Sequence, residues 1–247
     1  MRHRIPAVLT VLVLLGLQTS IWAQGGQRGA APAPPQSPKA AARTDITGYW
    51  VSYVTEDWQW RMITPKKGDF ASIPLNPEGR RVGDLWDPAK DEAAGDRCKA
   101  YGPPFLMRIP GRFHITWEND NTLRIDTDAG TQTRLFHFGE HAPAGEPTLQ
   151  GQSAAEWIPA GGRGGYLQVV TTNMRLGYLR KNGPPYSGNA KVTEFFDKVP
   201  GPNGVDWLIL QTIIEDPQYL TQPMVISTHY KKQADATGWN PTPCEAR

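Results

Sequence analysis

The stretch DITGYWVSYVTEDWQWR, residues 45–61, marks the start of the folded part of this chain. It carries three tryptophans, and its content of Trp, Tyr, Val and Ile favours a β-strand. Trp50 and Val54 alternate with Tyr49 and Val51, so large apolar side chains stand on both faces. We therefore expect a strand covered by core on one side and by further protein on the other, rather than an exposed hairpin.

The segment before this stretch predicts export. Arg2 and Arg4 precede an apolar run at residues 8–17, and Ala23 offers a small residue for cleavage. This is the pattern of a secretory signal peptide, with a retained N-terminal anchor as the alternative. We expect the signal peptide to span residues 1–23 and the mature protein to be secreted or periplasmic.

Composition divides the rest of the chain. Residues 24–44 contain no aromatic residue and consist largely of Ala, Pro, Gly and Gln, which predicts a disordered linker. Residues 45–247 have the size and apolar content of a single domain. After the signal peptide no stretch is apolar for long enough to predict a transmembrane helix.

The charges of the mature chain balance. The sequence has 26 basic and 24 acidic residues, and removal of Arg2 and Arg4 leaves 24 against 24. A nucleic acid or an anionic membrane would require a basic face, whereas here basic and acidic residues are interleaved. Neither partner is expected.

The two cysteines, Cys98 and Cys244, predict a disulfide. In an exported protein an even pair is most simply a cross-link, and two separate buried thiols are the alternative. The bridge would tie the first third of the domain to its last residues.

The pattern of segments predicts a mainly β fold with two short helices. Asn76-Pro77 and Asp87-Pro88 each place a capping residue before a proline, so we expect helices near residues 77–85 and 88–94. After Pro110, strand-like segments alternate with turns and no helix intervenes. The segments are RFHITWE (112–118), TLRIDTD (122–128), TQTRLFHF (131–138), SAAEWI (153–158), YLQVVTTN (166–173), KVTEFFDKV (191–199), DWLILQTIIED (206–216) and MVISTHYKK (224–232).

Polar residues among apolar neighbours favour an antiparallel up-and-down barrel over a β-sandwich, which remains the alternative. Glu194 shares a strand face with Val192 and Phe196, and Gln211 shares one with Ile209. Such positions suit a barrel whose lumen holds a ligand.

Two resemblances support this interpretation. TGYW resembles the Gly-x-Trp signature of lipocalins and related calycin barrels, with Gly48 and Trp50 in the matching positions. The resemblance implies a Trp that closes the base of the barrel. Four further blocks resemble a family of secreted bacterial proteins of unknown function, which implies export and one continuous domain but no activity: RCKAYGPPFLMRIPGRFHI (97–115), QGQSAAEW (150–157), LQVVTTNM (167–174) and IIEDPQYLTQP (213–223).

We expect the barrel to bind a small amphiphilic or aromatic molecule in its lumen. The connection at residues 171–189 is long and rich in groups that contact ligands, so it should cover the mouth of the barrel. A surface loop pinned by its aromatic residues is the alternative. The candidate ligand-binding residues are Arg134, Asn173, Arg175, Tyr178, Arg180 and Tyr186.

The alternative function is a small-molecule enzyme, a hydrolase, lyase or isomerase with a His/Glu acid–base pair in the same pocket. Structural ion pairs between strands are the simpler explanation of these residues. A third possibility is an envelope or surface-protein partner with no small ligand. The candidate catalytic residues are His114, Glu118, Asp126, Glu156 and Glu194.

Two motifs do not change these expectations. HFGEH, residues 137–141, spells an inverted zinc-protease motif, but it follows a strand-like segment rather than lying on a helix. GQSAA, residues 151–155, approaches a nucleophile elbow around Ser153, yet it lacks the final glycine and the strand-to-helix turn. We predict no metal and no cofactor.

Overall fold

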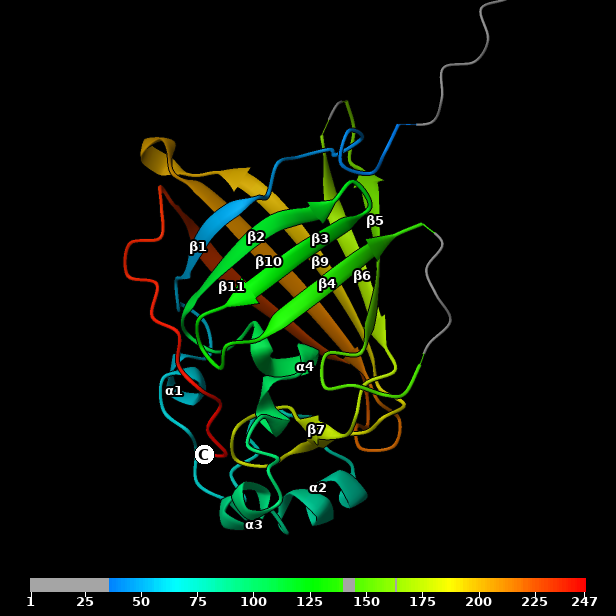
Figure 1. The fold of residues 1–247 in the computed structure, drawn as a ribbon. Helices are drawn as coiled ribbons and strands as arrows, with labels where there is room; N and C mark the ends of the chain where they lie inside the picture. Colours follow the sequence, from blue (N-terminus) through cyan, green and yellow to red (C-terminus); the bar gives the residue numbers. More distant parts are fainter. Residues whose placement is uncertain (1–35, 140–144, 163) are drawn as a thin grey trace, which may run out of the picture. The chain divides into compact units, whose positions relative to one another are not determined.

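The computed structural model describes residues 36–139, 145–162 and 164–247. Within these ranges nine strands close into a barrel in the order β1-β11-β10-β9-β6-β5-β4-β3-β2 (Figure 1). The strands are β1 (Gly48–Ser52), β2 (Arg112–Asn119), β3 (Thr122–Thr127), β4 (Thr133–Phe138), β5 (Gln152–Pro159), β6 (Gly165–Thr172), β9 (Lys191–Pro200), β10 (Asp206–Glu215) and β11 (Met224–Gln233).

The mainly β barrel predicted from the sequence is confirmed. The alternative sandwich is not formed, because β1 pairs with both β11 and β2 and leaves no open edge. One pair departs from the up-and-down pattern: β4 and β5 run parallel, while the other neighbours in the barrel are antiparallel. The connection between them, residues 139–151, is about as long as a parallel crossover requires.

The barrel interior is packed with side chains. Alternate residues of each strand point inward, and Trp50, Ile115, Phe136 and Leu208 are each 0% exposed. The indole Nε1 of Trp50 donates to the Ile46 carbonyl at 2.9 Å, so its one polar atom is satisfied inside the core. The opening tryptophan of the folded stretch is therefore a core residue of the barrel.

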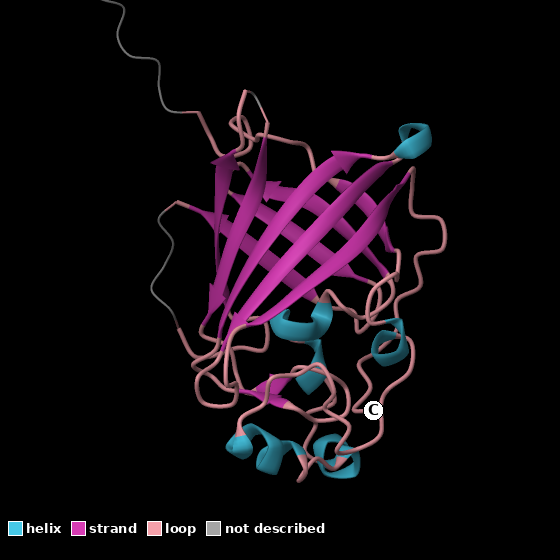
Figure 2. Ribbon diagram, turned by 180° about the vertical axis from the view of Figure 1, so that it is seen from behind, coloured by secondary structure: helices cyan, strands magenta, loops and turns pink. Residues whose placement is uncertain are grey.

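A second group of elements lies at one end of the barrel (Figure 2). We call it the lower lobe, and it comprises α1 (Trp58–Arg61), α2 (Pro77–Gly83), α3 (Pro88–Ala93), the 3-10 helix η1 (Lys99–Tyr101), α4 (Pro103–Leu106) and the strand pair β7 (Gly177–Tyr178) and β8 (Pro185–Tyr186). A further 3-10 helix, η2 (Pro202–Gly204), joins β9 to β10.

The two predicted helices are α2 and α3. Asn76 accepts a hydrogen bond from the Gly79 amide, and Asp87 accepts one from the Ala89 amide. Each cap is followed by proline at the first helical position, as expected. The single turns α1 and α4 were not predicted, because four residues are too few to show a helical period.

The segment around α4 closes this end of the barrel. Met107 packs into the barrel core, and its carbonyl accepts a hydrogen bond from the Tyr230 hydroxyl. The connection at residues 171–189, expected to cover the mouth, instead forms β7 and β8, which pack on η1 and α2. The connection is therefore a packed part of the lower lobe rather than a loop over the barrel mouth.

A disulfide joins the lower lobe to the C-terminal tail. Cys98 and Cys244 are bonded across a sequence separation of 146 residues. The predicted pairing is therefore present, and neither thiol is free.

The compact unit begins before the predicted domain boundary. It spans residues 36–247, and the Pro38 carbonyl accepts a hydrogen bond from Trp157 at 3.0 Å. The end of the segment predicted as a disordered linker therefore contacts the barrel. Residues 1–35, with the predicted signal peptide, lie outside the described residues.

Candidate functional site

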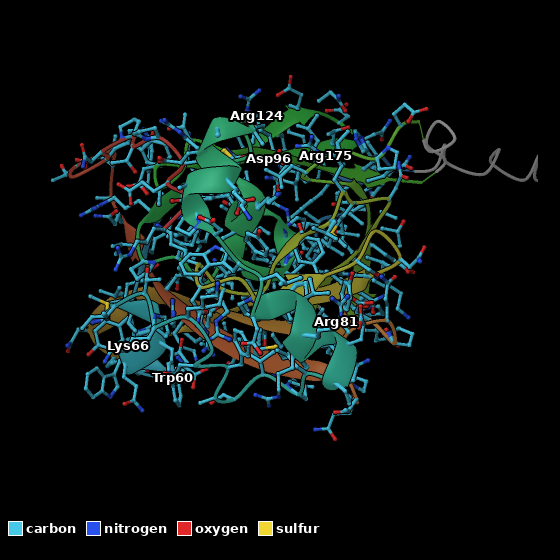
Figure 3. All side chains as sticks on the ribbon, turned by 90° about the horizontal axis from the view of Figure 1, so that it is seen from below. Trp60, Lys66, Arg81, Asp96, Arg124 and Arg175 are labelled. Atoms are coloured by element: carbon cyan, nitrogen blue, oxygen red, sulfur yellow. A yellow bond between two sulfur atoms is a disulfide. The ribbon has the colours of Figure 1, made fainter. Side chains whose placement is uncertain are left out.

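A cavity of about 280 Å³ lies in the lower lobe between α1, the segment that follows α4 and the segment that follows β7. We call it the arginine pocket. Figure 3 shows the molecule from below and labels Trp60, which forms part of the pocket wall. The pocket is lined by Trp60, Arg61, Met62, Thr64, Pro65, Phe105, Ile109, Pro110, Arg180 and Lys181.

The turn α1 divides its residues between the core and solvent. Arg61 is buried, with 6% exposure, whereas Trp58 is 61% exposed. Arg61 donates through Nε to the Arg108 carbonyl at 2.8 Å and through Nη1 to the Glu56 carboxylate. These contacts hold the guanidinium against the pocket wall.

Arg108 adds a second buried cation behind Arg61. Its Nη2 donates to the Asp57 carboxylate at 2.7 Å, and burial lowers the pKa of Arg108. Within the described residues, the Nη2 of Arg61 and the Nε of Arg108 are both buried and have no hydrogen-bond partner. Buried donors of this kind are rare in folded proteins because leaving them unpaired costs free energy.

Arg180 is the least compensated charge of the pocket. It is 2% exposed and donates only to backbone carbonyls, at 2.9 Å to Ala71 and at 3.5 Å to Asp69. Among the described residues no carboxylate lies within ion-pair distance of it. Burial, and then the neighbouring Arg108 charge, lower the pKa of Arg180 to about 10, although the charges of Asp69 and Asp57 oppose the shift.

The remaining walls are apolar or cationic. The Trp60 ring lies 5.5 Å from the Arg180 guanidinium carbon, and Phe105 and Ile109 add apolar surface. Lys181 lies 3.7 Å from the carboxylate of the exposed Glu245 and 5.1 Å from the centroid of the Tyr101 ring. The pocket therefore combines uncompensated positive charge with an aromatic wall, which suits an organic anion.

Of the six predicted ligand-binding residues, only Arg180 lines this pocket. Arg134 is inside the barrel, in a bidentate ion pair with Glu194 at 2.9 and 2.5 Å. Tyr186 is 0% exposed in the core of the lower lobe, and burial raises the pKa of its phenol. The sequence did not show that one of these residues lies in the pocket, one inside the barrel and one in the core of the lower lobe.

The other three predicted ligand-binding residues lie elsewhere in the lower lobe. Tyr178 donates to Asp91 at 2.8 Å, and Asn173 donates to the Gly145 carbonyl at 3.0 Å. Arg175 is exposed and lines a different cavity with Asp96, on the opposite side of Figure 3 from Trp60. The six residues therefore do not form one site.

The predicted catalytic residues are also dispersed. Glu194 points into the barrel, but His114, Glu118, Asp126 and Glu156 stand on its outer face, opposite the buried residues of their strands. The expectation that these four side chains face the lumen is wrong. The apolar residues of β2 and β3 fill the core, so the polar residues that alternate with them face outward.

Two of these outer residues have close neighbours on the barrel wall. His114 stacks on Tyr49 with ring centroids 3.9 Å apart, and burial lowers the pKa of His114. Burial raises the pKa of Asp126, but hydrogen bonds from Arg124 and Thr133 outweigh it and hold that pKa below its usual range. Both arrangements are typical of structural contacts between strands.

The short motifs do not add a site within the described residues. Ser153 is buried in β5 and lies 2.8 Å from the Thr171 hydroxyl, with no turn at the serine. The part of the chain that the structure describes holds no group of three or more His, Cys, Asp or Glu able to bind a metal ion. Glu140 and His141 of the HFGEH motif lie outside that part.

Sequence reasoning missed Trp60, Arg61, Arg108 and Lys181. Arg61 and Arg108 each lie within an apolar run, WQWRMI and FLMRIP, where an arginine is unusual unless its charge has a role. An arginine within an apolar run could therefore have identified both residues as candidates from the sequence. Their convergence on Arg180 depends on tertiary structure.

Comparisons with protein-family models, with curated proteins and with solved structures gave no match. In the described ranges, none of the helices combines the length and the apolar character needed to cross a membrane.

Proposed function

We propose that this protein binds a small organic anion with an aromatic or aliphatic group in the arginine pocket. The observation that carries the proposal is Arg180, a buried cation in the pocket wall with no carboxylate in contact. A buried charge without a partner is costly, and an anionic ligand would supply the partner.

The sequence predicted that a small molecule of this kind binds in the barrel lumen. The structure favours the arginine pocket instead. Core side chains occupy the barrel interior, and its ion pair between Arg134 and Glu194 is already satisfied at both carboxylate oxygens. In the arginine pocket, by contrast, Arg180 lies beside a cavity and has no carboxylate within ion-pair distance among the described residues. We therefore assign binding to the lower lobe.

The surface around the pocket supports an apolar part in the ligand. Trp58, Met62 and Ile63 are 61%, 59% and 70% exposed, and Met62 itself lines the pocket. Exposed apolar side chains that cluster beside a cavity are typical of binding sites. The anionic group would contact Arg180 while the apolar part contacts Trp60 and its neighbours.

The test is a fluorescence titration with 1-anilinonaphthalene-8-sulfonate, an aromatic sulfonate. Arg180→Met should weaken its affinity by about ten- to a hundredfold, because a charge-assisted hydrogen bond contributes about 1.5–3 kcal/mol. Arg175→Met is the matched control, since Arg175 lines the other cavity and was one of the ligand-binding residues expected from the sequence. That control should bind the probe like the wild type.

The opposite result would place the binding site in the cavity lined by Arg175. If Arg175→Met loses affinity and Arg180→Met does not, the ligand lies in the cavity of Arg175 and the arginine pocket is not the site. Native mass spectrometry of protein purified from its own host would then identify any retained molecule and show directly whether it is an anion.

We also propose that the protein is exported. The Cys98–Cys244 disulfide supports this proposal, because such bonds persist in oxidising compartments. The intact mass of the native protein should correspond to a chain that starts at Gln24. A mass that includes residues 1–23 would contradict cleavage.

A further inference from the structure

A second set of reactive side chains lies on the outer wall of the barrel. Ser227 and His229 are two residues apart on β11 and therefore share its outer face. The His229 Nε2 lies 3.4 Å from the Ser227 hydroxyl, and its Nδ1 lies 3.1 Å from a carboxylate oxygen of Glu56. The order hydroxyl, imidazole, carboxylate is that of a nucleophile, a general base and the group that orients the base.

Glu56 is held in place at both carboxylate oxygens. One oxygen accepts a hydrogen bond from Arg61. The other faces His229 and accepts from the Thr55 hydroxyl at 2.8 Å and from the Thr55 amide at 3.2 Å. The Nδ1 of His229 lies 3.1 Å from the Thr55 hydroxyl as well as 3.1 Å from this carboxylate, so both orient the ring. With the Nδ1–H directed to these acceptors, the Nε2 of His229 is free to accept the Ser227 proton.

A groove of about 350 Å³ begins beside this group. It is lined by Tyr166, Phe195, Asp197, Ile209 and Gln211, which stand on the outer faces of β6, β9 and β10. In the sheet register Gln211 lies directly opposite Ser227, and Ile209 lies directly opposite His229. Side chains of directly opposed residues lie about 4.5–5.5 Å apart at Cβ, so the groove is adjacent to the serine hydroxyl.

We propose that Ser227, His229 and Glu56 form a hydrolytic site for carboxylic esters whose aromatic or short aliphatic group occupies this groove. Ser227 Oγ attacks the ester carbonyl carbon while His229 Nε2 takes the hydroxyl proton. The bond to the leaving alkoxide breaks, and that oxygen receives the proton from His229. Water, activated by the same nitrogen, then attacks the acyl carbon. The bond to Ser227 Oγ breaks, that oxygen receives the proton from His229, and the carboxylic acid leaves.

The neighbouring residues have distinct roles in this reaction. The Gln211 carboxamide, across the sheet from Ser227, supplies an N–H donor for the negative charge on the carbonyl oxygen. Tyr166, Phe195 and Ile209 provide the apolar contacts for the substrate. Glu56 acts through His229 and is a positioning residue.

The site is separate from the arginine pocket, although Glu56 links the two. Arg180 contacts Ala71, Asp69 and Trp60 and none of Ser227, His229 or Gln211. Failure of the binding proposal would not affect this one.

The experiment labels the full mature chain with an alkyl fluorophosphonate and measures hydrolysis of p-nitrophenyl butyrate. We expect one adduct by intact mass, mapped to Ser227 by peptide analysis, and none in Ser227→Ala. His229→Gln should slow both reactions by about 10²–10⁴-fold, the usual contribution of a general base. Glu56→Gln should lower kcat with little change in KM.

Thr193→Ala, which removes an outer-face hydroxyl of β9, is the matched control and should react like the wild type. An adduct on another residue, labelling that survives Ser227→Ala, or the absence of both labelling and hydrolysis in the folded protein would each overturn the proposal. Circular dichroism of every variant shows that the barrel is intact.

Discussion

Two buried arginines, Arg134 and Arg180, have nearly the same exposure but opposite surroundings. Arg134 is 1% exposed inside the barrel, where Glu194 meets its guanidinium with both carboxylate oxygens. Arg180 is 2% exposed in the lower lobe, and among the described residues its hydrogen bonds go to backbone carbonyls. Burial alone therefore does not distinguish a structural arginine from a ligand-binding one.

The difference lies in charge compensation and in access. Glu194 compensates the charge of Arg134, and the pair is enclosed by core side chains such as Phe136, whose ring centroid lies 4.8 Å from the guanidinium carbon. Arg180 lines a cavity that an anion can enter. A compensated buried charge contributes to structure, while an uncompensated one beside a cavity points to binding.

Of the changes considered, loss of the disulfide should lower the free energy of unfolding most. The disulfide ties down the lower lobe, where Arg180 lies. Replacing Cys98 and Cys244 with serine removes a cross-link over a long loop, which chain entropy values at about 4–5 kcal/mol. Urea unfolding followed by tryptophan fluorescence should show that the free energy of unfolding falls by that amount. Reduction of the wild type should reproduce the result, and an unchanged midpoint would show that the bridge does not stabilise the fold.

Arg134→Met should cost about 3–5 kcal/mol in the free energy of unfolding, because it leaves the Glu194 carboxylate buried without a partner. The double variant Arg134→Met/Glu194→Leu removes both charges and should recover most of that loss. Chemical denaturation of the three proteins measures both effects. Equal stability of the single and double variants would mean that the carboxylate is not the source of the cost.

The same substitution at Arg180 should behave differently. Arg180→Met leaves no carboxylate unpaired, so we expect stability within about 1.5 kcal/mol of the wild type. The weakened affinity for the anionic probe should be its main effect. A loss of stability as large as that of Arg134→Met would remove the distinction between the two arginines.

Tyr186→Phe should have the smallest effect. The Tyr186 hydroxyl is buried without a hydrogen-bond partner, close to Gly102 and Gly177, and it lines no part of the arginine pocket. Removing it should stabilise the protein by up to about 1 kcal/mol and leave probe affinity unchanged. Thermal unfolding measures the first effect and the fluorescence titration the second. A weaker affinity would place this unpaired group in the binding site.

Local sequence signals determined the class of fold and several of its parts. The alternation of apolar residues along RFHITWE and KVTEFFDKV predicted strands, because the side chains of a strand repeat every two residues. The Asn76-Pro77 and Asp87-Pro88 pairs predicted α2 and α3, because capping acts within a few residues of a helix end.

Only the tertiary structure decided which charges meet. Arg134 and Glu194 are 60 residues apart in the chain, on strands β4 and β9, and both point into the same interior once β5 and β6 have placed those strands in the wall. Arg61, Arg108 and Arg180 converge from three separate segments of the lower lobe. Local patterns arise from contacts between near neighbours, which the sequence displays, whereas charge compensation depends on distances that barrel closure and packing of the lower lobe create.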